Sequence, residues 1–213
     1  MSSKIQRVCV GLMQTNCYIV DSTDSDGKAF LAVIDPGDSF LRIQGALDCE
    51  PTHIILTHSH FDHVGALGQL LEAYPNAKLA VGAQESMEIS QIAQVAQNLL
   101  GPFYFSRGYD EKFSKIRDAD IRLNDGDRIG PFTVLHTPGH TQGSICLYSP
   151  DDGILISGDT LFRHSCGRTD IGGSAEAMRT SLARLLSLNA NTKVYPGHGE
   201  ETVIGQERDC FFL

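Results

Sequence analysis

Four short apolar runs in this sequence each end in a turn-rich segment that carries histidine or aspartate. The first run leads into THSHFDH, and later runs lead into HTPGHTQGS, SGDTLF and YPGHGEET. A single histidine is more often a core or surface residue than a ligand, but five histidines and two aspartates at the ends of strand-like runs are typical of a metal site. We therefore expect a fold whose strand ends carry metal-binding side chains. The seven candidate ligands are His58, His60, Asp62, His63, His140, Asp159 and His198.

The segment THSHFDH holds four of these candidates close together. Side chains alternate in direction along an extended chain, so His58 and His60 point to the same side and can share one metal ion. A helix that starts at Asp62 or His63 would turn those two side chains towards a second ion beside the first. The segment therefore predicts two neighbouring metal sites.

The other three histidines lack this setting. His53 lies inside a strand-like run, and His136 comes shortly before the stronger candidate His140. Only its neighbourhood in the sequence suggests that His164 lies near a site. We interpret all three as structural or surface residues.

The spacing of apolar residues predicts two groups of strands, each accompanied by helices. Two such groups indicate an α/β fold with two sheets packed face to face and helices outside, the first three strands forming an antiparallel meander. In the first group we expect strands over 5–10, 17–20, 30–34, 53–56 and 78–81, with helices over 40–47, 64–74 and 84–100. In the second we expect strands over 120–123, 132–136, 144–148, 153–157 and 193–195, with a helix over 174–188.

Residues 101–118 have no clear period. Long connections without secondary structure of their own are often functional, so we expect this one to cover a site. Tyr104 and Arg107, which lie in it, are candidates for substrate binding.

Length and charge bound the other possibilities. At 213 residues the chain suits one domain, and we expect residues 1–213 to form it. Lys and Arg total 17 against 26 Asp and Glu, a net charge of -9, and no basic cluster gathers, which argues against a nucleic-acid partner. The start lacks a secretory signal, and no apolar stretch approaches membrane-spanning length. We therefore expect a cytoplasmic protein without a membrane partner.

The cysteines are scattered singly, without a C-x-x-C pair or a dense framework. We interpret them as reduced and mostly buried thiols. They are Cys9, Cys17, Cys49, Cys146, Cys166 and Cys210.

The motifs T-H-x-H-x-D-H, G-H-T-x-G-S, G-D-T-L-F and P-G-H-G together resemble the metallo-β-lactamase superfamily. The resemblance extends from MQTNCYIV and VIDPG to PGHGEETVIG, and it is strongest to short bacterial glyoxalase II-like (hydroxyacylglutathione hydrolase-like) proteins. It implies a four-layer αββα sandwich with the metals at one edge. It also implies that the turn at Asp35 is structural and supplies no ligand.

The resemblance further implies a division of the ligands between two divalent metal ions. We expect zinc, with iron or manganese as alternatives in one or both positions. His58, His60 and His140 would hold one ion, Asp62, His63 and His198 the other, and Asp159 would bridge them.

The C-terminal end departs from the full-length enzymes of this family. Those enzymes carry a C-terminal helical region that helps to hold glutathione, whereas only the short segment 199–213 follows His198 here. We therefore expect no C-terminal glutathione-binding domain. The ending ERDCFFL also places Cys210 and Phe211 where the short relatives would have Asn-Pro-Phe.

Leaving-group chemistry favours a thioester as the small-molecule substrate. Two adjacent metal ions lower the pKa of a shared water to about 7, so a metal-bridging hydroxide is the expected nucleophile, oriented by Asp62. A thiolate, whose conjugate acid has a pKa of about 8.5, departs without a strong general acid. We therefore predict a metal-dependent thioester hydrolase that acts on a hydroxyacylglutathione.

Other functions would fit the same fold. Persulfide dioxygenases hold a single iron with a subset of these ligands and resemble CGRTD at residues 166–170, although PGHG around His198 matches the hydrolases better. A lactonase would use the same metal set on an ester ring. The acidic charge disfavours a nuclease. A non-catalytic module is disfavoured because all seven ligands are present.

Two further sets of residues are expected near the metals. Arg168 has a guanidinium fork that suits a substrate carboxylate, although an internal pair with Asp170 explains it equally well. Hydroxyl groups often orient metal-bound imidazoles. The candidates for that role are Thr57, Thr137 and Thr141, although a plain role as strand or turn residues explains them about equally well. The sequence carries no signal for an oligomeric state.

Overall fold

Two six-stranded sheets form the centre of the computed structural model, which describes residues 3–24, 26–88, 92, 96, 98, 113 and 115–211. In the first sheet, β1 to β3 are antiparallel and β3 to β6 are parallel. Its strands, in spatial order, are β1 (Lys4–Val10), β2 (Thr15–Thr23), β3 (Ala29–Ile34), β4 (His53–Leu56), β5 (Lys78–Gly82) and β6 (Ile121–Leu123).

The second sheet is antiparallel except where β10 and β13 pair in parallel. A separate hairpin joins β11 (Leu161–Phe162) to β12 (Ser165–Cys166). The spatial order of the second sheet is β14 (Thr202–Val203), β13 (Lys193–Pro196), β10 (Ile154–Gly158), β9 (Ile145–Ser149), β8 (Phe132–His136) and β7 (Arg128–Ile129).

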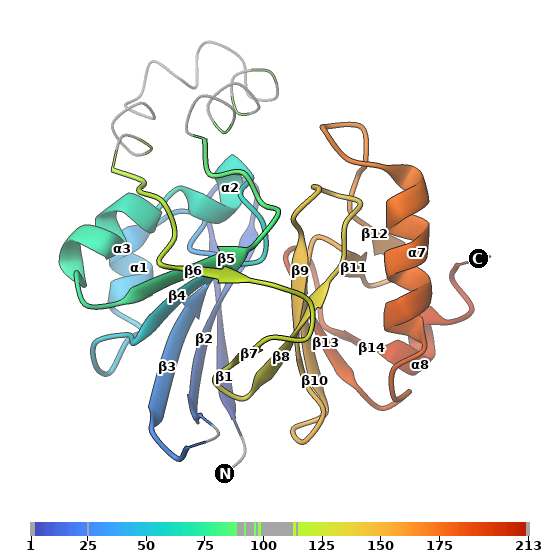
Figure 1. Ribbon diagram of the computed structural model, residues 1–213, viewed down its shortest axis with the longest axis horizontal. Helices are drawn as coiled ribbons and strands as arrows, with labels where there is room; N and C mark the ends of the chain where they lie inside the picture. The colour runs from blue at the N-terminus through green and yellow to red at the C-terminus, as the bar shows by residue number, and fades with distance from the viewer. Residues whose placement is uncertain are drawn as a thin grey trace.

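Helices lie on the outer side of each sheet, which gives four layers (Figure 1). The first sheet carries α1 (Phe40–Gln44), α2 (Phe61–Val64) and α3 (Leu67–Ala73), and the second carries α7 (Ala175–Leu186) and α8 (Ile204–Glu207). Among the described residues, no helix combines the length and the apolar character that a membrane crossing needs. The predicted α/β fold, an αββα sandwich, is confirmed.

Alternating side chains of the strands fill separate cores. In β2, Tyr18 and Val20 point into the core between the sheets, whereas Cys17 and Ile19 point into the core under α1 and α3. A third core lies between the second sheet and α7, where Leu182 and Leu185 are buried. Because strand side chains alternate with period two, each sheet can bury both faces and so hold a helix layer and a sheet layer.

The predicted strands are all present, and their bounds shift by at most three residues. The predicted helix over 64–74 is present as α3, but it starts later, at Leu67, because Val64 ends the separate helix α2. The break follows from close packing, because a side chain at Gly65 would lie 2.2 Å from the carbonyl oxygen of Gly37, and the Ala66 amide donates to the Pro36 carbonyl at 2.9 Å.

The predicted helix over 84–100 is wrong at its start, where residues 84–88 form a turn and irregular backbone. The cause is a tight turn after β5, in which the Glu85 amide donates to the Gly82 carbonyl at 3.0 Å. Most of the remainder of that prediction, and most of the connection 101–118, lies outside the described residues.

Candidate metal centre

The segment after β4 changes from extended chain to helix within four residues. His58 and His60 come from the extended part, and the helix α2 starts at Phe61, with His60 still extended at φ −63° and ψ 148°. Asp62 and His63 lie in the first turn of that helix. The helix therefore starts slightly earlier than predicted and turns the second pair of side chains away from the first.

The other three candidate ligands follow strands of the second sheet. His140 lies in the loop between β8 and β9, Asp159 directly follows β10, and His198 follows β13. The centre therefore forms where loops of both halves of the molecule meet. All seven candidates come together there.

His58, His60 and His140 form the first ligand group. One ring nitrogen of each lies within 4.8 Å of the others, and the ring centroids of His60 and His140 are 4.4 Å apart. Nε2 of His58 and Nε2 of His140 are buried and have no hydrogen-bond partner. Buried polar atoms are nearly always paired, so these two nitrogens fit a metal ion held by the group.

Asp62, His63 and His198 form the second ligand group. Nε2 of His198 lies 3.2 Å from Oδ2 of Asp62 and 3.3 Å from Nε2 of His63. Imidazole nitrogens directed at each other and at one carboxylate oxygen suit a second ion.

Asp159 lies between the two groups. Its Oδ2 is 3.5 Å from Nε2 of His140 in the first group and 3.5 Å from Nε2 of His198 in the second, and its Oδ1 is 3.4 Å from Nε2 of His63. Oδ1 is buried without a hydrogen-bond partner. A side chain at Gly197 would lie 2.1 Å from this oxygen, so the chain needs glycine there to bring Asp159 and His198 together.

Groups outside the centre hold the Nδ1 atoms of the imidazoles. Nδ1 of His140 donates to the Arg168 carbonyl at 2.7 Å, and Nδ1 of His198 lies 3.1 Å from the Met13 carbonyl oxygen. Nδ1 of His58 lies 3.1 Å from the Thr57 hydroxyl. Such contacts fix the ring orientation and leave Nε2 to face the metal.

Asp35 lies outside both ligand groups and contacts Thr57, beside the first, and His63, in the second. Its oxygens accept hydrogen bonds from the amide and the hydroxyl of Thr57, at 2.8 and 2.7 Å, and Oδ2 lies 3.1 Å from Nδ1 of His63. Because these oxygens are already engaged, Asp35 orients Thr57 and His63 and is not needed as a ligand. This agrees with the structural role expected for its turn.

The other two predicted orienting hydroxyls do not contact an imidazole of the described centre. The Thr137 hydroxyl lies 3.0 Å from that of Thr160, and the Thr141 hydroxyl donates to Glu85 at 2.6 Å. For Thr137 and Thr141 the structure therefore favours the alternative role as turn residues, because their hydroxyls are directed into neighbouring loops. Glu85, which sequence reasoning missed, carries no local signal that would have marked it.

The two groups differ in their protonation. Burial, together with neighbouring imidazoles, lowers the pKa of His58 well below its usual range and that of His60 to about 3. Burial alone would also lower the pKa of His63, but Asp159, Asp62 and Asp35 together raise it to about 10. Likewise Asp62 and Asp159 outweigh burial and raise the pKa of His198, while His63 and His198 outweigh burial and lower the pKa of Asp62.

The predicted substrate-binding residues have different outcomes. The exposed Arg168 side chain pairs with Asp170, with Nε to Oδ1 at 2.7 Å, which is the alternative that the sequence left open. Tyr104 and Arg107 lie outside the described residues.

The three histidines that were not expected to be ligands have contacts outside the centre. The ring nitrogens of His136 and His164 contact the Gln142 carbonyl and Cys210 respectively, and His53 contacts Thr52.

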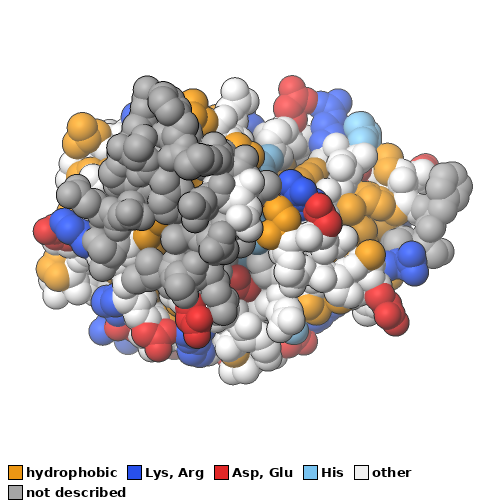
Figure 2. Space-filling view, turned by 90° about the horizontal axis from the view of Figure 1, so that it is seen from above, with side chains coloured by type: hydrophobic (Ala, Val, Ile, Leu, Met, Phe, Trp, Pro, Cys, Tyr) orange, Lys and Arg blue, Asp and Glu red, His pale blue; other side chains and the backbone are white. Residues whose placement is uncertain are grey.

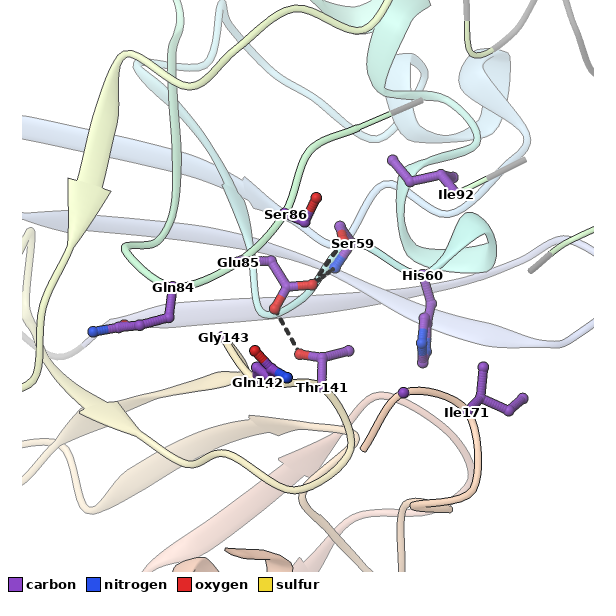
Figure 3. Close-up of a pocket in the computed structure, with 11 residues that line it drawn as sticks. Ser59, His60, Gln84, Glu85, Ser86, Ile92, Thr141, Gln142, Gly143 and Ile171 are labelled. Carbon is purple, nitrogen blue, oxygen red and sulfur yellow. Dashed lines mark hydrogen bonds between the residues drawn. The ribbon is translucent and has the colours of Figure 1, made fainter. Parts of the chain in front are cut away.

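A cavity of about 400 Å³ opens beside the first ligand group. His60, Thr141, Gln142 and Ile171 contribute to its wall (Figure 3). Figure 2 views the molecule from above, and on the described part of that face basic and acidic side chains are interspersed while histidine reaches the surface only in small areas. Of the seven candidate ligands, His60 lines this cavity, which therefore reaches the edge of the first ligand group.

Known proteins resemble this chain in sequence and in fold. A sequence model of the metallo-beta-lactamase superfamily matches residues 10–198. The chain is 35% identical to the probable metallo-hydrolase YqgX of Bacillus subtilis, over 97% of this chain and 95% of that protein. It is 31% identical to hydroxyacylglutathione hydrolase GloC of Haemophilus influenzae, over 96% and 94% of the two chains. The crystal structure of TTHA1623 in a di-iron-bound form superposes with a TM-score of 0.79 at 36% identity, covering 95% of this chain and 96% of that one.

Proposed function

The chain belongs to the metallo-β-lactamase superfamily, and from this membership we propose that it is a two-metal hydrolase that cleaves thioesters, hydroxyacylglutathiones among them. The family resemblance carried by its four motifs is thereby confirmed. The observation that carries the proposal is the set of buried, unpartnered atoms, Nε2 of His58, Nε2 of His140 and Oδ1 of Asp159, which face one centre.

The donor chemistry supports two divalent ions, with zinc as the proposed metal. Imidazole nitrogen and carboxylate oxygen without sulfur suit zinc, and iron is an alternative because the similar TTHA1623 was crystallised with two irons. When bound, two such ions would make a coordinated water acidic near neutral pH and would polarise a carbonyl oxygen. We assign His58, His60 and His140 to one ion, Asp62, His63 and His198 to the other, and Asp159 to both.

Asp62 is proposed to orient the attacking water. Its pKa is lowered, so the carboxylate is ionised at neutral pH and can only accept hydrogen bonds. The Thr15 hydroxyl donates to Oδ2 at 3.3 Å and fixes the position of the carboxylate. Asp62 can therefore accept a hydrogen bond from the water. This bond would orient a lone pair of the water oxygen towards the substrate carbonyl.

The cavity wall favours a thioester over an amide. Among the described residues that line it there is no lysine, arginine or tyrosine, and His60 is neutral at pH 7 because its pKa is lowered to about 3. An amine leaving group needs a proton from a general acid, whereas a thiolate, with a conjugate acid pKa of about 8.5, does not. Glu85 also lies on this wall, but both of its oxygens already accept hydrogen bonds. The described part of the wall therefore offers no ready proton donor, which supports a thiolate leaving group.

The test combines metal analysis with hydrolysis of lactoylglutathione and of simpler, uncharged thioesters. We expect about two metal ions per chain and thioesterase activity that a chelator removes and zinc restores. In Asp62→Ala the activity should fall more than about a hundredfold, since even residues outside the ligand shell cost 10–100-fold. Asp152→Ala, which changes an aspartate bonded to Ser3 and Ser149, serves as the matched control.

Three results would contradict the proposal. They are full activity in Asp62→Ala, activity in metal-free protein, and a single bound iron with oxygen consumption on glutathione persulfide. Hydrolysis of lactones but not of thioesters would retain the two-metal site and replace the substrate class.

A further inference from the structure

Glu85 is a buried carboxylate that lies outside both ligand groups. It follows β5, its residue is 5% exposed, and its side chain forms part of the cavity wall (Figure 3). Oε1 accepts hydrogen bonds from the Ser59 amide at 3.0 Å and the Ser59 hydroxyl at 2.6 Å, and Oε2 accepts one from the Thr141 hydroxyl at 2.6 Å. Burying a charge is costly, so a carboxylate retained here with three donors calls for a reason.

The partners of Glu85 are neighbours of the first ligand group. Ser59 lies between His58 and His60, and Thr141 directly follows His140. The Ser59 segment comes from the first sheet, and the Thr141 segment comes from the loop between β8 and β9 in the second. One carboxylate therefore joins the two segments that supply all three nitrogens of the group.

The backbone around Glu85 is itself firmly placed. Nη1 of Arg122 donates to the Glu85 carbonyl at 2.6 Å, and a side chain at Gly143 would lie 2.1 Å from the Glu85 amide nitrogen. The backbone of Glu85 is thus held in place, and the two ligand segments are bonded to its carboxylate. A rigid support of this kind sets the distance between His140 and the other two imidazoles.

The hydrogens in this network have a defined direction. The Thr141 hydroxyl gives its hydrogen to Oε2 of Glu85. The Ser144 hydroxyl, 2.7 Å away, must then donate to Thr141, and its oxygen accepts from the Thr141 amide at 3.1 Å. The directions of the hydrogen bonds in the loop that carries His140 are therefore set by the bond to Glu85.

We propose that Glu85 is the positioning residue of the first metal site, because its carboxylate links the segment of His58 and His60 to that of His140. The inference rests on the proposed two-metal function. It predicts that loss of the carboxylate lowers the affinity of the three histidines for their ion. The affinity of Asp62, His63 and His198 for the other ion should not change.

The experiment measures metal content and zinc affinity by titration in the full chain. In Glu85→Ala we expect one ion to bind 10–100-fold more weakly, the range for residues that orient ligands, and the other to bind as in the wild type. In a His63→Ala background, Glu85→Ala should weaken the remaining ion, whereas in a His58→Ala background it should not. This pair of backgrounds identifies the ligand group that depends on Glu85.

Glu85→Gln is the conservative variant. Its amide oxygen can accept from Ser59 and its NH₂ can donate to the Thr141 oxygen, so both links survive without the charge. We expect two ions with nearly wild-type affinity. Loss of the first ion in Glu85→Gln as in Glu85→Ala would make charge rather than linkage the cause and would overturn the proposal.

Glu207→Ala is the matched control for a lost buried carboxylate. Glu207 is fully buried and accepts from the Thr202 hydroxyl and the His164 amide, and the contacts described for it involve none of the seven candidate ligands of the centre. We expect this variant to melt at a lower temperature and still bind two ions. Equal weakening of both ions in Glu85→Ala and Glu207→Ala would mean general destabilisation and would overturn the proposal.

Thr141→Val and Thr141→Ser keep the test decisive if Glu85→Ala does not fold. Valine removes the hydroxyl and should weaken the first ion, whereas serine keeps it and should not. Unchanged affinity in Thr141→Val and Glu85→Ala refutes the positioning role alone. Absence of two ions from the wild type refutes the proposed function instead.

Discussion

The two ligand groups of the centre have opposite electrostatic surroundings. The first contains only imidazoles, and the pKa values of His58 and His60 are lowered. The second contains Asp62 and faces Asp35 and Asp159, so the pKa of His63 is raised to about 10. His58 and His60 of the first group are therefore neutral at pH 7 before a metal arrives, while His63 of the second holds a proton that a metal must displace.

The groups also differ in how the two halves of the molecule are tied beside them. Glu85 joins the segments of the first group through side-chain bonds to Ser59 and Thr141. Beside the second group, the Asn16 side chain of β2 donates to the carbonyls of Pro196 and Gly199, at 2.9 and 3.0 Å, on either side of His198. Each site thus has its own link across the molecule, and among the seven candidate ligands Asp159 faces both groups.

Removing that common residue should have the largest effect. In Asp159→Ala both groups lose a carboxylate, so we expect both ions to bind at least about a hundredfold more weakly and thioesterase activity to disappear. Metal analysis after dialysis and the thioester assay check this. The control is again Asp152→Ala. Retention of both ions in Asp159→Ala would show that the two groups do not share a ligand.

The pH dependence of zinc affinity should differ between the two groups, and we expect this effect to be of intermediate size. Metal-free His63 stays protonated below its pKa of about 10, so the zinc affinity of the second group should rise with pH up to that value. His60, with a pKa of about 3, has no proton to lose above about pH 4, and the pKa of His58 is also lowered, so these two ligands of the first group should contribute no such dependence.

Calorimetric titration in buffers with different ionisation heats measures the protons released at pH 7. His58→Ala leaves the second group, and we expect it to release about one proton more per ion than His63→Ala, which leaves the first. Equal release from the two variants would remove the electrostatic difference between the groups.

The smallest effect is expected from the Arg168 side chain. It is exposed and paired with Asp170, whereas the Arg168 carbonyl is the atom that accepts from His140. Because Arg168→Ala keeps the carbonyl, we expect unchanged metal content and little change in the melting temperature. A rise in KM at constant metal content would support the substrate contact suggested by the sequence, while loss of the first ion would contradict the assignment of orientation to the backbone.

The sequence revealed those features that depend on local pattern. Strand alternation placed His58 and His60 on one side, and the helix start after His60 separated Asp62 and His63 from them. Contacts between distant segments left no such pattern. Glu85 lies 26 residues from Ser59 and 56 from Thr141, and the division between α2 and α3 depends on Gly37, far earlier in the chain.

Gly197 shows how such distant packing would appear in a mutational scan. It has no functional group, yet any side chain there would meet Oδ1 of Asp159 and the His63 ring, at 2.1 and 2.9 Å. Every substitution at this position should therefore inactivate the protein as thoroughly as loss of a ligand. A scan scored by activity alone would rank Gly197 among the catalytic residues, although its contribution is only the empty volume that it leaves.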